Sequence, residues 1–201
     1  MKSRFIAAMD SLQEEATKGD LSLKRIFEIM GEEGHSVLII FLCVPYMQPV
    51  PIPGLSTPFG ITMSLIAWFL YRSRPPWLPE RFRELKISAS SVTKVTEIAE
   101  RIWAKVARKL RARWLIFYDN PIFRFINLLV FVSNGILLAL PLPIPFSNSF
   151  PAAAIMVCAV GHMEKDGVFI FVSYLLALAS YAYFIGLGMG LTWTVFTVTG
   201  G

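Results

Sequence analysis

The sequence has few charged residues, and three long stretches of it have none. Asp, Glu, Lys and Arg make up 16% of the 201 residues, compared with about 25% in average soluble domains. Residues 35–71, 125–163 and 167–201 contain none of these four residue types. Stretches of this length exclude a soluble globular fold, a disordered chain and a disulfide-stapled secreted module. The pattern predicts an all-α integral membrane protein with a single membrane domain over residues 1–201.

The sequence also lacks the residue patterns of most catalytic and metal sites. Its two cysteines, Cys43 and Cys158, lie in uncharged stretches without CxxC spacing, so we interpret them as small apolar residues and not as a disulfide or a metal pair. No nucleophile–base pair, metal cluster or glycine-rich phosphate loop is visible in the sequence. We therefore expect no enzymatic activity, no metal and no cofactor. We also expect no secretory signal, because Asp10 and Glu14 interrupt the apolar core that one needs.

The charges that are present are unevenly distributed. Thirteen of the nineteen Lys and Arg residues lie between residues 72 and 124, and the positive-inside rule predicts that this region faces the cytoplasm. Apolar residues recur at helical spacing in 4–30 and in 86–113, which predicts amphipathic helices. The basic 86–113 helix either lies in the membrane interface, with anionic headgroups as its partner, or packs on the protein's own membrane domain. Because membrane lipids are the nearer polyanion, we expect no nucleic-acid partner.

A proline string occurs twice in the uncharged stretches. The pattern Pro-x-Pro-Ile-Pro begins at Pro49 and again at Pro141, 92 residues later, and in both places it follows an apolar run and precedes hydroxyl residues and another proline. This recurrence predicts an internal repeat, with repeat 1 over about 1–79 and repeat 2 over about 80–166. Residues 167–201 then form a C-terminal transmembrane segment. Its Gly186 and Gly190 have the small-xxx-small spacing of close helix packing, either within the chain or across a homodimer.

The apolar segments beside the proline strings are short. About ten residues precede Pro45 and about fourteen follow Pro58, so each arm reaches about 15–21 Å, less than the hydrocarbon core of about 30 Å. Residues 121–140 are just long enough to span, whereas 151–162 are again too short. The lengths predict two broken re-entrant helical hairpins with Pro-x-Pro-Ile-Pro apices. Because unpaired backbone at membrane depth must be covered, we expect the two apices to cover each other or to line a shared cavity.

The apices carry the residues that we predict to bind a substrate. Thr57 before Pro58, and Ser149 near Pro151, have the pattern of a helix N-cap followed by a first-turn proline. Two helix N-termini would then face the middle of the bilayer, where free N–H groups favour anions. The predicted substrate-binding residues are Ser56, Thr57, Ser147, Asn148 and Ser149, with Arg72 and Arg74 at the cavity mouth. The alternative is that the prolines and hydroxyls only cap two buried turns and that the arginines only anchor the interface.

Three further residues lie at the edges of the uncharged stretches. His35 and His162 each stand near carboxylates, and Glu164 is one of them. An imidazole in such a place can relay protons near neutral pH, so we predict a weak proton relay of His35, His162 and Glu164. The alternative is that these residues are wetted groups at the interface.

The order of these features resembles the ExoD family of bacterial membrane proteins. The resemblance rests on the residues Pro49–Gly54 with Ser56 and Thr57, Arg72–Pro79, Leu140–Pro145 with Asn148 and Pro151, and Glu164–Gly167. It implies a multi-pass protein of the bacterial inner membrane, associated with exopolysaccharide synthesis and with tolerance of alkaline conditions, and it supplies no catalytic residues. The repeated half-hairpins also resemble the DedA superfamily of lipid-carrier transporters, by architecture alone.

Three functions are compatible with these patterns. The leading hypothesis is transport of an anionic substrate, with a lipid-linked phosphate as one candidate, bound at the paired hairpins. The second is an ion or proton carrier that supports alkaline tolerance. The third is a non-transporting scaffold subunit of the polysaccharide machinery.

Overall fold

The structure is a computed structural model that describes residues 4–31, 33–47, 56–72, 84, 86–90, 92–93, 96–97, 110–140, 142 and 144–199. Most of the described residues are helical, as predicted. The helices are α1 (Arg4–Ala16), α2 (Leu23–Met30), α3 (Glu33–Cys43) with the 3-10 helix η1 (Val44–Met47), α4 (Ser56–Tyr71), α7 (Ile116–Asp119), α8 (Pro121–Ala139), α9 (Ser149–Glu164) and α10 (Gly167–Thr199). Two short strands, β1 (Leu21–Ser22) and β2 (Lys86–Ile87), pair antiparallel. The proline string at 49–53 and most of the predicted 86–113 helix lie outside the described residues.

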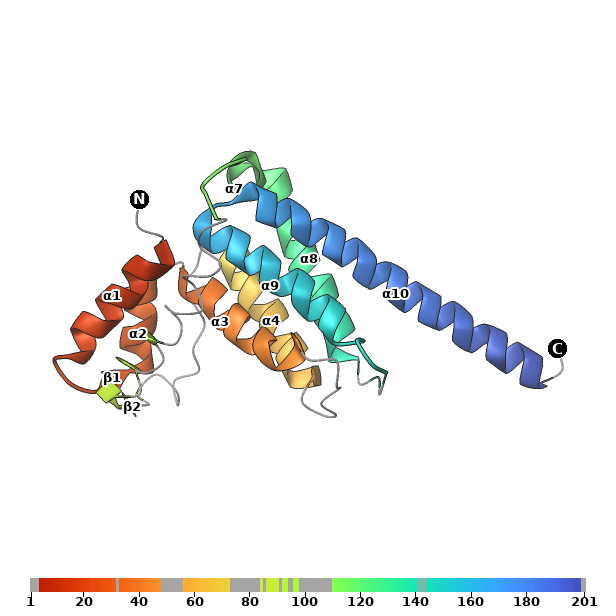
Figure 1. The fold of residues 1–201 in the computed structure, drawn as a ribbon, viewed down its shortest axis with the longest axis horizontal. Helices are drawn as coiled ribbons and strands as arrows, with labels where there is room; N and C mark the ends of the chain where they lie inside the picture. The colour runs from red at the N-terminus through yellow and green to blue at the C-terminus, as the bar shows by residue number, and fades with distance from the viewer. Residues whose placement is uncertain are drawn as a thin grey trace.

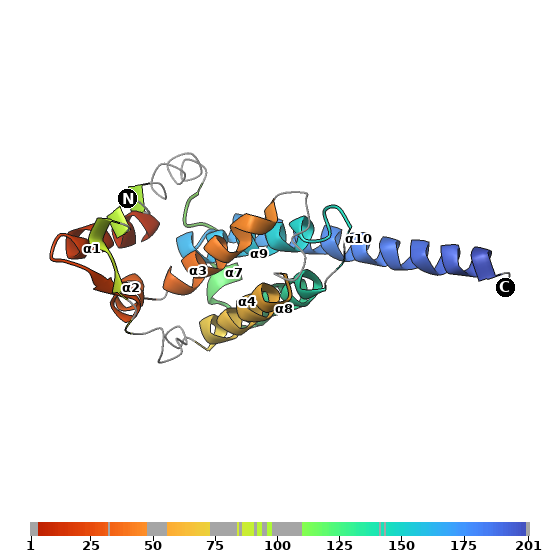
Figure 2. The same ribbon diagram turned by 90° about the horizontal axis from the view of Figure 1, so that it is seen from below.

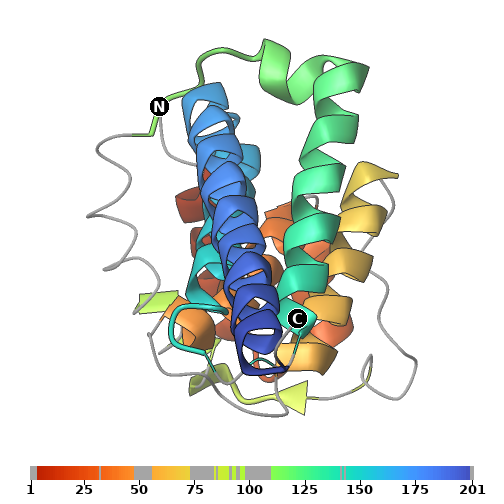
Figure 3. The same cartoon turned by 90° about the vertical axis from the view of Figure 1, so that its right-hand side faces the viewer.

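The centre of the molecule is a bundle of α3, α4, α8 and α9, with α10 along one side (Figure 1). Helix α4 packs on α8, α3 packs on α9, and α10 packs mainly on α9. Figure 3 looks along α10 and shows α4, in yellow and orange, beside the green α8. The buried core between these helices includes Ile39, Met63, Phe131 and Ile155. The uncharged stretches therefore do pack against one another.

Helix α8 begins and ends where its sequence indicates. The Asn120 side chain accepts a hydrogen bond from the backbone N–H of Ile122 (2.9 Å), and Pro121 occupies the first turn, where no partner for its nitrogen is needed. The helix ends at Ala139, because Leu140 precedes Pro141 and adopts an extended backbone. Helix α8 thus ends just before the second proline string.

Two of the described helices are long and apolar enough to cross a membrane. Helix α8 has 19 residues and a length of about 28 Å. In α10 the apolar part is Gly167–Gly190, with 24 residues and a length of about 36 Å. Helices α4 and α9 have 16 residues each, or about 24 Å. The predicted C-terminal segment is therefore a single helix, which continues past the rest of the bundle (Figure 1).

The N-terminal helices form a second layer at the end of the molecule opposite the C-terminus (Figure 2). Helix α1 buries Phe5, Met9 and Leu12 in a cluster that also contains Val160 and Met163 of α9. The predicted amphipathic face of α1 therefore exists, and it packs on the protein itself.

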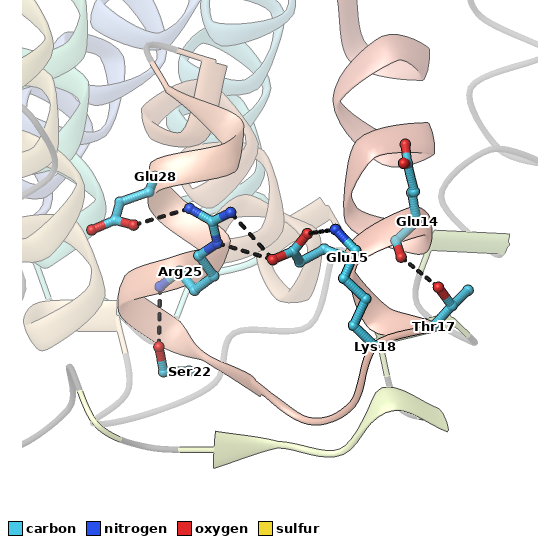
Figure 4. Close-up of polar contacts among 7 residues, drawn as sticks. All are labelled: Glu14, Glu15, Thr17, Lys18, Ser22, Arg25 and Glu28. Atoms are coloured by element: carbon cyan, nitrogen blue, oxygen red, sulfur yellow. Dashed lines mark hydrogen bonds and ion pairs between the residues drawn. The ribbon is translucent and has the colours of Figure 1, made fainter.

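Polar contacts between α1 and α2 hold this layer together on its exposed side (Figure 4). The Glu15 carboxylate accepts hydrogen bonds from Lys18 Nζ (2.7 Å) and from Arg25 Nη2 (3.2 Å), and Arg25 also reaches Glu28. These bonds, first to Lys18 and then to Arg25, hold the pKa of Glu15 below its ordinary value. Ser22 caps α2 by accepting from the backbone N–H of Arg25 (3.2 Å).

Candidate functional site

The start of α4 lies against the end of α8. The Thr57 hydroxyl donates a hydrogen bond to the Ala139 carbonyl oxygen (2.7 Å). At the other end of the same pair, Arg124 Nη2 donates to the Tyr71 carbonyl oxygen (3.0 Å). These two bonds fix α4 and α8 as antiparallel, so the described part of the first apex is beside the second hairpin.

The backbones of α4 and α8 approach each other closely between those two bonds. A Cβ added at Gly60 would collide with the Gly135 carbonyl oxygen, and one added at Gly135 would collide with the Ser64 hydroxyl. Only glycine permits this approach, which is how small residues join helices in a membrane. Helices α4 and α8 are therefore held together by backbone contact as well as by the hydrogen bonds at the ends.

The second apex is a compact turn covered by α10. The Ser147 hydroxyl donates to the Leu142 carbonyl oxygen (3.2 Å), and the Tyr183 hydroxyl donates to the Pro145 carbonyl oxygen (2.6 Å). The hydroxyls of Ser147 and Thr57 thus both satisfy carbonyl groups of the second hairpin. That is the role that the alternative interpretation gave to the apical hydroxyls.

The backbone N–H groups at the start of α9 are already bonded. The N–H groups of Ser149 and Phe150 both donate to the Phe146 carbonyl oxygen (3.0 and 3.3 Å), and that of Ala152 donates to Asn148 (3.1 Å). Pro151 has no N–H group. The free N–H groups that we expected at this helix start are therefore not there. Phe146 makes this possible by adopting a left-handed backbone conformation, with φ of 65°.

Asn148 is the polar side chain that remains at this helix start. It precedes the first residue of α9 but makes no side-chain capping bond. The side chain is only 5% exposed, and its Oδ1 atom has no hydrogen-bond partner. Thr57 and Ser149, which we predicted to be helix N-caps, lie inside their helices instead. Ser149 is the first residue within α9 and Thr57 the second within α4. A ligand at the second apex would therefore meet Asn148 before any backbone amide.

Of the two predicted arginines, Arg72 lies at the other end of the bundle. Arg72 directly follows α4, whose 16 residues separate it from Ser56 by about 24 Å. Its guanidinium lies over the Trp68 ring, 5.3 Å from the centroid. Arg74 is outside the described residues. The structure therefore brings Ser56 and Thr57 next to the second hairpin and leaves Arg72 far from them.

The predicted proton-relay residues also lie at this far end. His35 is buried in the first turn of α3. The His162 ring lies 5.4 Å from the Tyr118 ring and 6.0 Å from the Phe131 ring, measured between centroids, and its Nε2 atom is buried without a hydrogen-bond partner. Glu164 Oε1 accepts from the backbone N–H of Phe5 (3.2 Å). Glu164 thus ties α1 to the end of α9.

The interface of α8 with α10 contains polar side chains that the sequence analysis missed. The Tyr174 hydroxyl donates to Asn127 Oδ1 (2.6 Å), and Asn127 Nδ2 donates to the Phe117 carbonyl oxygen (2.9 Å). Two turns further on, the Tyr181 hydroxyl contacts Ser133 Oγ (2.5 Å) and Asn134 Nδ2 (3.4 Å). Asn127 and Asn134 are seven residues apart, as are Tyr174 and Tyr181. That shared spacing in two uncharged stretches is the signal that could have identified the contact.

Asp166 holds the turn between α9 and α10. Its carboxylate is completely buried and accepts from Arg113 Nε and from the backbone N–H groups of Arg111 and Val168, each at 3.0 Å. A buried carboxylate is stable only with such partners. Asp166 thereby fixes the end of the basic region to the start of α10.

These observations define a mostly helical protein, with two apolar helices long enough to span a membrane and with amide, phenol and hydroxyl groups buried between its helices. The model of the family described as "Exopolysaccharide synthesis, ExoD" matches residues 5–186. The chain belongs to the ExoD family, as its sequence motifs indicated.

Two relatives show how far this similarity extends. "Protein ExoD" of Rhizobium meliloti (strain 1021) is 31% identical over 169 residues, which cover 84% of this chain and 70% of the relative. "Uncharacterized protein slr1875" of Synechocystis sp. is 27% identical over 151 residues, which cover 74% of this chain and 69% of the relative. No solved structure matches the chain.

Proposed function

We propose that this chain is an inner-membrane protein of exopolysaccharide synthesis that binds a phosphate-bearing, lipid-linked substrate where its two hairpins meet and moves it across the membrane. Membership of the ExoD family supports the association with exopolysaccharide synthesis. The observation that carries the transport proposal is the buried, unpartnered acceptor oxygen Oδ1 of Asn148 at the start of α9, beside a turn whose tip is exposed. Polar groups buried within membrane helices commonly mark substrate pathways.

The proposal includes a duplicated plan for the hairpins. Positions 92 residues apart share the same burial. Both residues are buried in the pairs Ile39 and Phe131, Met63 and Ile155, and Ala67 and Ala159. The two hairpins also make reciprocal contacts. The second arm of each packs on the first arm of the other, α4 on α8 and α9 on α3. Both observations support two similar halves that meet about an approximate two-fold axis. The hairpins would then enter from the same side of the membrane.

The same spacing pairs Ser56 with Asn148 as the centre of the proposed site. Both side chains are buried at the start of the second arm of their hairpin. The hydroxyls of Thr57 and Ser147 already bond carbonyl groups, so their role in the proposed site is to shape it. An amide and a hydroxyl at the centre suit a substrate with hydrogen-bonding groups in addition to its negative charge.

The path away from the apex would follow the interface of α8 with α10. Asn134 Oδ1 is buried there without a hydrogen-bond partner, and Ser180 Oγ of α10 is also buried without one. These atoms could contact a polar headgroup in transit, while its lipid chain remains in the bilayer.

Reconstitution tests the transport proposal. Vesicles containing the full chain and a fluorescent polyprenyl phosphate are treated with a membrane-impermeant quencher, and the rate at which the inner-leaflet label becomes quenchable is measured. We expect Asn148→Leu to reduce this rate about tenfold, because a hydrogen bond to a buried polar group contributes about 1–3 kcal/mol. Ser11→Ala, at an exposed site on α1, is the control and should leave the rate unchanged. Equal rates for wild type, Asn148→Leu and empty vesicles would refute transport at this site and leave the scaffold role as the better explanation.

The proposed arrangement in the membrane places the basic region 72–124 in the cytoplasm, with anionic headgroups against 86–113.

The proposal also includes a homodimer through the face of α10 that carries Gly186 and Gly190. A Cβ added at either glycine would meet nothing within 4 Å, so the face is open for a second copy. Cysteine cross-linking at Ile185, which is exposed, should give a dimer in membranes, and its absence there would contradict the dimer.

A further inference from the structure

Two arginines at the outer end of the α4–α8 pair lie on neighbouring aromatic rings. The Arg72 guanidinium is 5.3 Å from the centroid of Trp68, and that of Arg124 is 6.0 Å from the centroid of Tyr71. The centroids of Trp68 and Tyr71 are 6.2 Å apart, and Phe125 adds a third ring 6.4 Å from Tyr71. These five residues, which we call the arginine–aromatic strip, form one continuous surface from two helices.

The strip is fixed in place and carries positive charge. The hydrogen bond from Arg124 Nη2 to the Tyr71 carbonyl oxygen (3.0 Å) joins its two helices. Arg72 forms no ion pair with any of the residues that the structure describes. Two guanidinium groups held on adjacent rings repel each other, so an anion placed beside them is favoured. Guanidinium groups bind phosphate oxygens through paired hydrogen bonds.

The surroundings of the strip suit a lipid better than a soluble phosphate. Trp68 is 44% exposed, Phe125 49% and Ile122 67%. Phe125 and Ile122 belong to α8, one of the two candidate spans. Exposed apolar side chains beside an arginine pair provide a surface for acyl chains, and Trp and Tyr commonly lie at the level of the headgroups. The region that follows Arg72 is also the most basic part of the chain, which suits the negatively charged cytoplasmic leaflet.

We infer that the arginine–aromatic strip binds the headgroup phosphate of an anionic phospholipid, with the acyl chains lying along Trp68, Ile122 and Phe125. The strip is about 24 Å from Ser56 by the length of α4, so it is separate from the proposed transport site and does not depend on it. Its role is to hold the outer ends of α4 and α8 at the membrane surface through a bound lipid.

Lipid enrichment tests this inference with the full chain. The protein is placed in nanodiscs of phosphatidylglycerol and phosphatidylcholine in equal amounts, released into detergent, and its retained lipids are measured by mass spectrometry. We expect wild type to retain phosphatidylglycerol in excess and Arg72→Gln to reduce that excess about fivefold, the effect of one basic side chain at an anionic surface. Arg72 is exposed and lies at a helix end, so its replacement leaves the bundle intact.

Two further arms make the result decisive. Lys24→Gln removes a charge from an exposed position on α2 and should leave the excess unchanged, whereas Arg72→Lys should keep part of it. Glycerol phosphate added at the release step should not displace the lipid, because it has no acyl chains. An unchanged excess in Arg72→Gln, an equal loss in Lys24→Gln, or displacement by glycerol phosphate would each overturn the inference.

Discussion

Helix α8 contacts α4 and α10 in different ways. Toward α4 it presents Gly135, whose backbone touches the backbone of Gly60. Toward α10 it presents Asn127 and Asn134, which reach the hydroxyls of Tyr174 and Tyr181. Glycine contact requires one fixed separation, because no side chain can adjust to a change. Contact through long polar side chains tolerates small shifts and can exchange partners with a substrate or with water.

The comparison suggests which interface can move. The α4–α8 interface joins the two hairpins and is bonded at both ends, through Thr57 and Arg124. The α8–α10 interface has the unpartnered Oδ1 atom of Asn134. If the protein transports a substrate as proposed, α10 is the element that would separate from the hairpins, while α4 and α8 would stay together.

The largest expected effect comes from filling the glycine contact. Gly135→Val should destabilise the protein by at least about 3 kcal/mol, because the new side chain collides with the Ser64 hydroxyl and with the Gly60 backbone, and overpacking against backbone is poorly relieved. The measurement is the yield of monodisperse protein and its thermal midpoint in detergent. Gly188→Ala is the matched control, because a Cβ there meets nothing within 4 Å. A Gly135→Val protein as stable as Gly188→Ala would show that the two hairpins are not in backbone contact.

Much of this arrangement follows from the sequence, and the rest has identifiable physical causes. The proline strings and the uncharged stretches predict where α4, α8 and α9 begin or end, because proline is tolerated in the first turn of a helix and breaks its interior. The distance of Arg72 from the apex also follows from the sequence, once α4 is recognised as a continuous helix of 16 residues. The pairing of α8 with α10 depends on how the two helices are aligned with each other. Neither uncharged stretch defines that alignment by itself.

The occupied amides at the start of α9 could not have been predicted. They depend on Phe146, a non-glycine residue with positive φ. Such a conformation is costly for an aromatic residue, and no local sequence pattern indicates it. The tertiary contacts of the turn, including the bond from Tyr183 to Pro145, are what compensate for it.

A smaller effect separates the two asparagines of the polar interface. Asn127→Leu should destabilise the protein by about 1–2 kcal/mol, because it leaves the Tyr174 hydroxyl and the Phe117 carbonyl without their partners. Asn134→Leu should be nearly neutral, since Oδ1 has no partner and Nδ2 bonds mainly to Val130 within its own helix. Thermal midpoints of the two variants in the same detergent test this ordering. A larger loss in Asn134→Leu would mean that the second contact, and not the first, holds α10 in place.

The smallest effect is expected outside the bundle, in the α1–α2 layer, where the contacts are ionic and exposed to water. The pKa of Glu15 is lowered by its bonds to Lys18 and Arg25, so the folded state favours the ionised carboxylate. Its contribution to stability is present above the pKa of the unfolded chain and is lost as the pH falls through the lowered pKa. Glu15→Gln should therefore lower the thermal midpoint slightly at neutral pH and not at all in acid below that pKa. The difference should also shrink when salt is added, because exposed ion pairs are screened. A Glu15→Gln effect that persists in acid would show that the side chain acts through packing, as the residues of the α4–α8 interface do, and not through its charge.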